Sequence, residues 1–172
     1  MKRTTSLGVF SGTPHPIHGI AQLTHGGPAS RLQRAVVQSL YEMNGSKEAR
    51  PLSVAGRPGT YDGEVSFQIG VGNGVYFDYL DAETLGELFE LMNRRNALPV
   101  LDFLIVVTYH YLRGGKRVAL RFDHHLLRFV FHKDRVELLL AHTKGIRRTP
   151  LDELLSRVIG RIIREAERQR LK

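Results

Sequence analysis

The chain has 172 residues, 42% of them hydrophobic, which suits one domain with flanking segments. It contains no cysteine, and this excludes disulfides, thiolate nucleophiles and cysteine-ligated zinc. No apolar run approaches the roughly 18 residues of a membrane span, and no apolar stretch follows Lys2 and Arg3 as in a secretion signal, so we expect a cytoplasmic protein without membrane association.

The net charge of +8 is unevenly distributed along the chain. Residues 63–102 carry a net charge of −5, whereas residues 103–142 carry +4 and residues 143–172 carry +5. Of the 25 basic residues 19 are Arg, whose planar guanidinium binds phosphate oxygens in pairs. Arginine-rich chains without cysteine also suit a thermophile. The asymmetry indicates either an anionic partner for one face or an ordinary solvated surface.

Residues 1–62 are predicted to be an N-terminal extension, largely disordered. Residues 1–27 are rich in Gly, Thr, Ser, Pro and His and show no sustained hydrophobic period. Residues 28–43 carry one apolar helical stripe between Pro28 and a stop at Asn44-Gly45, which predicts a short helix. Residues 45–62 are rich in Pro and Gly and are predicted to be a linker.

The core is predicted over residues 63–148, as an α+β domain with an antiparallel sheet of four to six strands. Strand patterns at 64–70 and 75–80 flank Gly72-Asn73-Gly74, a turn typical of a tight hairpin. Asp81 is the expected N-cap of an inserted helix over 82–96. Four more strands are predicted at 103–112, 117–122, 126–132 and 135–142, with turns at Gly114-Gly115, Asp123-His124-His125 and Lys133-Asp134.

Residues 149–172 are predicted to form a long C-terminal helix that packs on the sheet and dimerises. Thr149 is the expected N-cap and Pro150 the first helical residue. The apolar stripe is wider than a single packing seam requires, so part of it is available to a second copy. The residues expected to form this homodimer are Val158, Ile159, Ile162, Ile163 and Ala166.

No residue constellation in the sequence is typical of an active site, and we expect a non-enzyme without metal or cofactor. The eight histidines lack the helical i, i+4 spacing of zinc enzymes. The glycines at 70–74 lack the Lys-Ser/Thr of a P-loop. A cryptic metal hydrolase built on Asp123, His124 and His125 is the catalytic alternative.

Aromatic and basic residues alternate along the predicted strands, a composition that suits single-stranded nucleic acid, where cations track phosphates and rings stack on bases. Strict alternation puts Val118, Leu120 and Phe122 on one face with Arg121 opposite, and Leu127, Phe129 and Phe131 on a face opposite Arg128. The basic loop before the last helix adds backbone N–H groups as a candidate anion site. The residues predicted to bind nucleic acid are Tyr76, Arg113, Lys116, Arg117, Arg121, Arg128, Lys144, Arg147 and Arg148.

The order of elements and the turn His142-Thr143-Lys144-Gly145-Ile146-Arg147-Arg148, followed by a zipper-like helix, resembles the ThermoDBP-related family of archaeal single-stranded DNA-binding proteins over residues 63–172. The resemblance implies a sheet cleft with an aromatic floor and basic rims, and dimers formed through the C-terminal helix. It implies Tyr76 as floor and Arg121, Arg128, Arg147 and Arg148 as rims. The resemblance does not extend to residues 1–62. The alternatives without catalysis are a dimeric interaction or assembly protein and a double-stranded DNA-binding regulator.

Overall fold

The computed structural model describes residues 6–12, 17–54, 56–95 and 98–170. Its elements in chain order are β1 (Gly19–Thr24), α1 (Ala29–Met43), β2 (Lys47–Ala49), β3 (Leu52–Ser53), β4 (Thr60–Tyr61), β5 (Gly63–Asn73), β6 (Tyr76–Tyr79), α2 (Ala82–Arg95), β7 (Val100–Arg113), β8 (Lys116–Phe131), β9 (Arg135–Lys144) and α3 (Leu151–Arg170). The predicted α+β class is confirmed. Among the described helices, none combines the length and the hydrophobicity of a membrane span.

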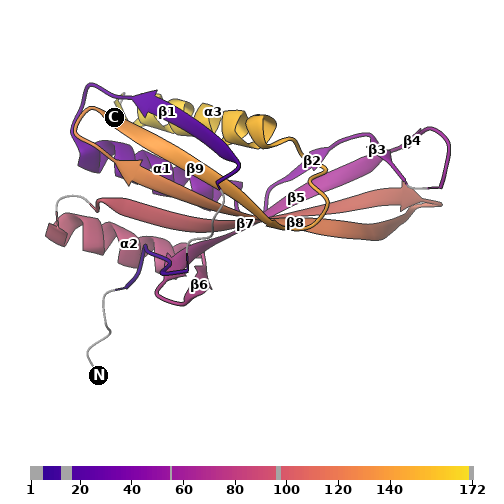
Figure 1. The fold of residues 1–172 in the computed structure, drawn as a ribbon, viewed down its shortest axis with the longest axis horizontal. Coiled ribbons are helices and arrows are strands. Elements are labelled where there is room, and N and C mark those ends of the chain that lie inside the picture. The colour runs from indigo at the N-terminus through magenta and orange to yellow at the C-terminus, as the bar shows by residue number, and fades with distance from the viewer. Residues whose placement is uncertain (1–5, 13–16, 55, 96–97, 171–172) are drawn as a thin grey trace.

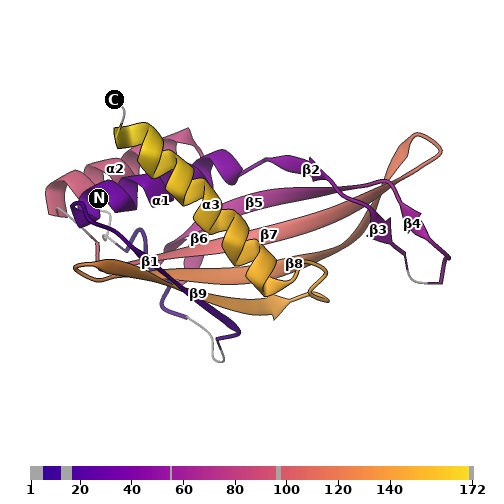
Figure 2. The same cartoon turned by 90° about the horizontal axis from the view of Figure 1, so that it is seen from above.

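Seven antiparallel strands form one strongly twisted sheet in the order β1-β9-β8-β7-β5-β2, with β6 paired to β5 (Figures 1 and 2). The β7–β8 hairpin is the longest pair, and its tip extends beyond the helices at one end of the molecule. Strands β3 and β4 form a separate pair beside this tip, where Tyr61 packs on Tyr111 with ring centroids 5.6 Å apart. The sheet therefore has a helix-covered body and a projecting arm.

Alternation along the strands gives the sheet two different faces. One face, here called the covered face, buries side chains such as Phe67, Ile105 and Phe129 beneath α1 and α3. Helix α3 uses the same stripe that was predicted to dimerise: Val158 and Ile162 are buried and Ile159 is partly buried in this core. The other face, here called the open face, lies opposite α1 and α3, and α2 packs against α1.

Residues 1–62 differ from their predicted organisation. Residues 19–24 pair with β9, and α1 buries Val36 and Leu40 in the core. Residues 45–62 contribute β2, which pairs with β5, and the β3–β4 pair. Residues 6–12 fill the gap where β5 and β7 diverge, with the Gly8 amide donating to the Gly72 carbonyl at 2.7 Å. Apart from those of α1, whose helix was predicted, these contacts are made mainly by backbone groups, so a weakly patterned sequence does not reveal them.

Parts of four predicted segments lie outside the described residues. They are residues 1–5 and 13–16 of the segment predicted to be disordered, residue 55 of the predicted linker, residue 96 at the end of the predicted inserted helix, and residues 171–172 of the predicted C-terminal helix. The corrections above therefore concern residues 6–12 and 17–54 and the described part of 56–62.

The helix boundaries follow the predicted signals with one exception. The Asp81 carboxylate accepts the Thr84 amide at 2.9 Å, and this hydrogen bond lowers the pKa of Asp81. The hairpin of β5 and β6 turns at Gly74, where φ is +70°. Helix α3 instead begins at Leu151, and the Thr149 hydroxyl lies 2.7 Å from the Tyr109 hydroxyl.

Candidate nucleic-acid interface

The open face is built from alternate residues of the three central strands. Cross-strand pairs place Leu104 beside Leu126, Val106 beside His124, and Thr108 beside Phe122. Strand β9 adds Lys144 next to His124. Leu104, Val106 and Leu126 are half-buried on this face. The face is therefore an apolar floor with polar and cationic groups at one end.

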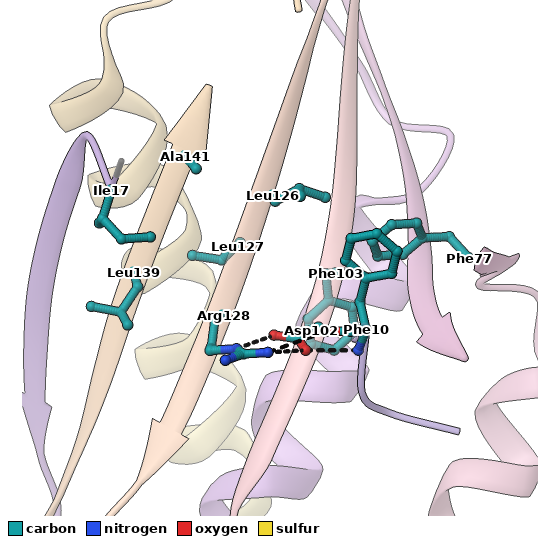
Figure 3. A pocket seen from close by; sticks show the side chains of 10 residues that line it. All are labelled: Phe10, Ile17, Phe77, Asp102, Phe103, Leu126, Leu127, Arg128, Leu139 and Ala141. Atoms are coloured by element: carbon teal, nitrogen blue, oxygen red, sulfur yellow. Dashed lines mark hydrogen bonds and ion pairs between the residues drawn. The ribbon is translucent and has the colours of Figure 1, made fainter. Parts of the chain in front are cut away.

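The other end of the open face is filled by residues of the chain itself. Figure 3 shows Arg128 and Asp102 facing each other across β8 and β7, with Phe10 beside them. Arg128 Nε lies 2.7 Å from Asp102 Oδ1 and Arg128 Nη2 lies 2.9 Å from Asp102 Oδ2, while the Phe10 amide donates to the same carboxylate at 2.8 Å. Phe10 also packs on Phe77 with ring centroids 4.6 Å apart. The cavity that remains measures about 10 Å³, close to the minimum for a single water molecule.

Arg128 therefore forms an internal ion pair with Asp102. Its hydrogen bond to Asp102 raises the pKa of the guanidinium. Because Asp102 is almost fully buried, loss of Arg128 would leave a desolvated carboxylate without its cation. The predicted role of Arg128 as a phosphate-binding rim does not fit this arrangement.

Exposed Phe122 and Lys144 and half-buried His124 form a cluster on the open face. The Phe122 ring is 41% exposed, and its centroid lies 5.0 Å from that of His124 at a tilt of 32°. Lys144 Nζ lies 5.4 Å from the Phe122 centroid, within the range of a cation–π contact. Burial, and then the charge of Lys144, lower the pKa of His124, so its ring is neutral at pH 7. Two flat, uncharged rings thus lie beside a cation.

A β-bulge puts Phe122 on this face. Thr108 pairs with Phe122 while His110 pairs with Ala119, so β8 has two residues, Leu120 and Arg121, opposite Tyr109. The extra residue reverses the alternation, and Leu120 packs on the core whereas Phe122 points the other way. The predicted common face of Val118, Leu120 and Phe122 is wrong for this reason. The predicted turn at 123–125 is also wrong, because β8 is continuous.

The buried carboxylate of Asp123 fixes the basic loop between β9 and α3. It accepts hydrogen bonds from the Tyr109 hydroxyl at 2.8 Å, His142 Nε2 at 3.1 Å, and the Arg147 and Arg148 amides at 2.8 and 2.9 Å. Burial alone would raise the pKa of Asp123, but these hydrogen bonds outweigh it and hold the pKa below the usual value. Burial raises the pKa of Tyr109, so its hydroxyl stays protonated and donates.

The loop that Asp123 holds differs from the predicted anion site. The Arg147 and Arg148 amides, which were candidates to bind an anion, are both bonded to Asp123. The Arg148 guanidinium donates to the Ser53 carbonyl at 2.9 Å and lies 5.8 Å from the Tyr109 ring centroid. The side chains of Lys144, Ile146 and Arg147 remain exposed on this loop.

The other predicted cations lie on the arm. Arg113 and Lys116 are exposed at its tip on either side of Gly114-Gly115, and Arg121 is exposed next to Phe122. Arg117 Nη2 is paired with Glu64 Oε1 at 2.6 Å. The register puts Arg113, Lys116 and Arg121 on the side of Tyr109 and Tyr111, so these cations line the arm on the side opposite Phe122.

Tyr76 lies apart from this group. It pairs with Asn73 on β5, so its side chain points toward the covered side, and it lines a hollow together with Asp78, Glu83 and Glu90. A ring surrounded by carboxylates is a poor floor for a polyanion. The structure does not bring Tyr76 together with Arg121 or Arg128.

Phe122 and His124 are the residues that sequence reasoning did not assign to binding. Their place depends on the bulge, and a bulge has no reliable composition signal in a single sequence. The three residues of the predicted metal hydrolase do not lie on one side of the sheet: His124 points to the open face, whereas Asp123 and His125 are buried on the covered side. Among the described residues, no group of three or more His, Asp or Glu side chains is placed to hold a metal ion.

Comparisons of the chain with protein-family models, with curated proteins and with solved structures found no match.

Proposed function

We propose that this protein binds single-stranded nucleic acid with little sequence specificity through the Phe122 end of its open face. The main support for the proposal is the ring pair of exposed Phe122 and half-buried His124 beside Lys144. Bases stack on such rings at a gain of roughly 1–3 kcal/mol per base, and every base has a face to stack. Exposed Lys144 and Arg147 supply cations for the phosphates.

The shape of the site supports a single strand over a duplex. The rings lie in the floor of a sheet, where only unpaired bases can reach them. Helices α1 and α3 are packed against each other, and α2 presents Glu83 and Glu90 to solvent. On the exposed side of α3, Arg168 is already paired with Glu42 and Glu165. The resemblance to ThermoDBP-related proteins stays a prediction, and the proposal does not depend on it.

Anisotropy titrations of a labelled oligo(dT), its RNA equivalent and a duplex of equal length, each at several salt concentrations, test the proposal. We expect the single strands to bind more tightly than the duplex, with an affinity that falls as salt rises. Phe122→Ala should weaken binding about 5- to 150-fold, the equivalent of one lost stack. Lys144→Gln should reduce the salt slope by roughly 0.7, the value for one phosphate contact on a single strand.

Tyr76→Ala is the matched control, because it removes another exposed ring from the same sheet. Its affinity should equal that of the wild type. Stronger binding of the duplex, or a salt slope near zero, would contradict the proposed function. Loss of affinity in Tyr76→Ala with none in Phe122→Ala would show that the open face is the wrong surface.

A further inference from the structure

Strand β1 is the outer strand of the sheet at the β9 side, and within the described residues it pairs with β9 alone. The register pairs Gly19 with Leu140 through Thr24 with Arg135, and the His25 amide donates to the Asp134 carbonyl. Antiparallel ladders alternate between residues bonded to the neighbour and residues whose backbone groups point away. The N–H and C=O groups of Ile20, Gln22 and Thr24 therefore point outward from the sheet.

This edge lacks the features that keep sheet edges from associating. Natural proteins protect exposed edge strands with charges, prolines, bulges or very short strands. The other edge strands of this sheet follow that rule: β2 has only three residues, including Lys47 and Glu48, and β6 contains Asp78 and ends after four. Strand β1, of sequence Gly-Ile-Ala-Gln-Leu-Thr, has neither charge nor proline.

Apolar side chains are exposed on both sides of the same edge. Ile20 is 67% exposed on the open side of β1. On the covered side Ile163 of α3 is 41% exposed, and it lines a hollow together with Leu23 and Ala166. An unpaired backbone flanked by apolar groups suits a partner strand that carries apolar groups in the same positions.

We propose that the partner is a second copy of this chain, whose β1 pairs antiparallel with β1 about a two-fold axis. The two edges are identical and uncharged, so they meet without the repulsion that a net charge of +8 imposes elsewhere. The interface runs along β1 and takes in Ile20 and Ile163. It differs from the predicted zipper, because Val158 and Ile162 are buried within the chain's own core.

A two-fold axis normal to the sheet keeps the open faces of both copies on one side of a continuous sheet. If the proposed function holds, the dimer presents two ring clusters to one strand and covers a longer segment of nucleic acid. Only this consequence rests on the proposed function. The dimer itself is measured without nucleic acid, so the two proposals fail separately.

Light scattering coupled to size exclusion tests the dimer on the full chain. The wild type should elute with twice the monomer mass of 19.5 kDa. Gln22→Pro should be monomeric, because proline removes an outward N–H and blocks strand addition while costing no bond to β9. Gln22→Ala changes the same exposed side chain without changing the backbone, and it should remain dimeric.

Ile20→Lys provides a second disruption that leaves the backbone intact, since Ile20 is largely exposed and its loss should not affect folding. It should also be monomeric, with a circular dichroism spectrum like that of the wild type. A monomeric wild type at all concentrations would overturn the proposal. A dimer that survives both Gln22→Pro and Ile20→Lys would also overturn it. The same holds if Ile163→Glu abolishes the dimer whereas Gln22→Pro and Ile20→Lys do not.

Discussion

Replacing His125 by leucine should make this protein more resistant to acid. His125 is fully buried on the covered face, and neither of its ring nitrogens has a hydrogen-bond partner. Its ring packs edge-on against His142 with centroids 5.1 Å apart. Burial first, and then the nearby charges of His142 and Arg147, lower the pKa of His125 to about 4. The folded protein therefore holds this ring neutral where an unfolded chain would protonate it.

The size of the effect follows from the two pKa values. An unfolded histidine titrates near 6.5, so between about pH 6.5 and pH 4 the unfolded state binds more protons than the folded state. Stability is then lost as pH falls through this window, at up to about 1.4 kcal/mol per pH unit. From pH 7 to pH 5 the loss attributable to His125 is about 2 kcal/mol. Leucine has similar volume and no proton to take up, so His125→Leu should lose about 2 kcal/mol less over the same interval.

Urea denaturation of both proteins at pH 7 and pH 5 measures this difference, provided the slope of free energy against urea is unchanged. His125→Leu should be at least as stable as the wild type at pH 7, because no described hydrogen bond is lost. His110→Gln, at a half-buried position near the arm, is the control and should behave as the wild type. If His125→Leu and the wild type lose equal free energy between the two pH values, the buried neutral state of His125 is refuted.

Two further predictions concern the loop after β9 and helix α3. Gly145 has a φ of +103° and an added Cβ would overlap Asp123 Oδ1, so Gly145→Ala should destabilise the protein by roughly 2 kcal/mol or more in urea denaturation. Gly160→Ala, in open space on α3, should instead stabilise it by about 0.5–1 kcal/mol, and equal effects of the two changes would contradict the loop geometry. Ile162→Ala should cost about 2–5 kcal/mol because Ile162 is fully buried, whereas Ile163→Ala should cost much less, and thermal melts that rank them in reverse would mean that α3 is rotated on the sheet.

The elements with strong local signals were predicted correctly. The apolar stripe of residues 28–43, the Asp81 cap and the Asn73-Gly74 turn lead to α1, α2 and the β5–β6 hairpin. Each of these elements is stabilised by interactions between residues that are close in sequence, so the local sequence pattern is enough to predict it. The class of the fold followed from the order of these elements.

The position of the candidate site depended on contacts between distant residues. The bulge opposite Tyr109 decides that Phe122 faces outward, and it lies in the part of β8 that pairs with β7 alone, before the pairing with β9 begins at His124. Tertiary contacts also place Arg128 in an ion pair within the protein, and this does not fit its predicted role in binding phosphates at the rim. Asp102 lies far from Arg128 in sequence but opposite it on the neighbouring strand, and its carboxylate binds the guanidinium.

The sequence by itself determined the three helices, the first hairpin, the strand-rich core and the separation of acidic from basic segments, since propensity, capping and charge are properties of short stretches. Only the tertiary structure decided three points: residues 19–24 form an edge strand, Val158 and Ile162 of the predicted dimer contact lie in the chain's own core, and Phe122 and His124 rather than Tyr76 lie beside an exposed cation. The reason is that backbone pairing, register and burial are set by partners far away in the chain, and a single sequence carries no record of which partners meet.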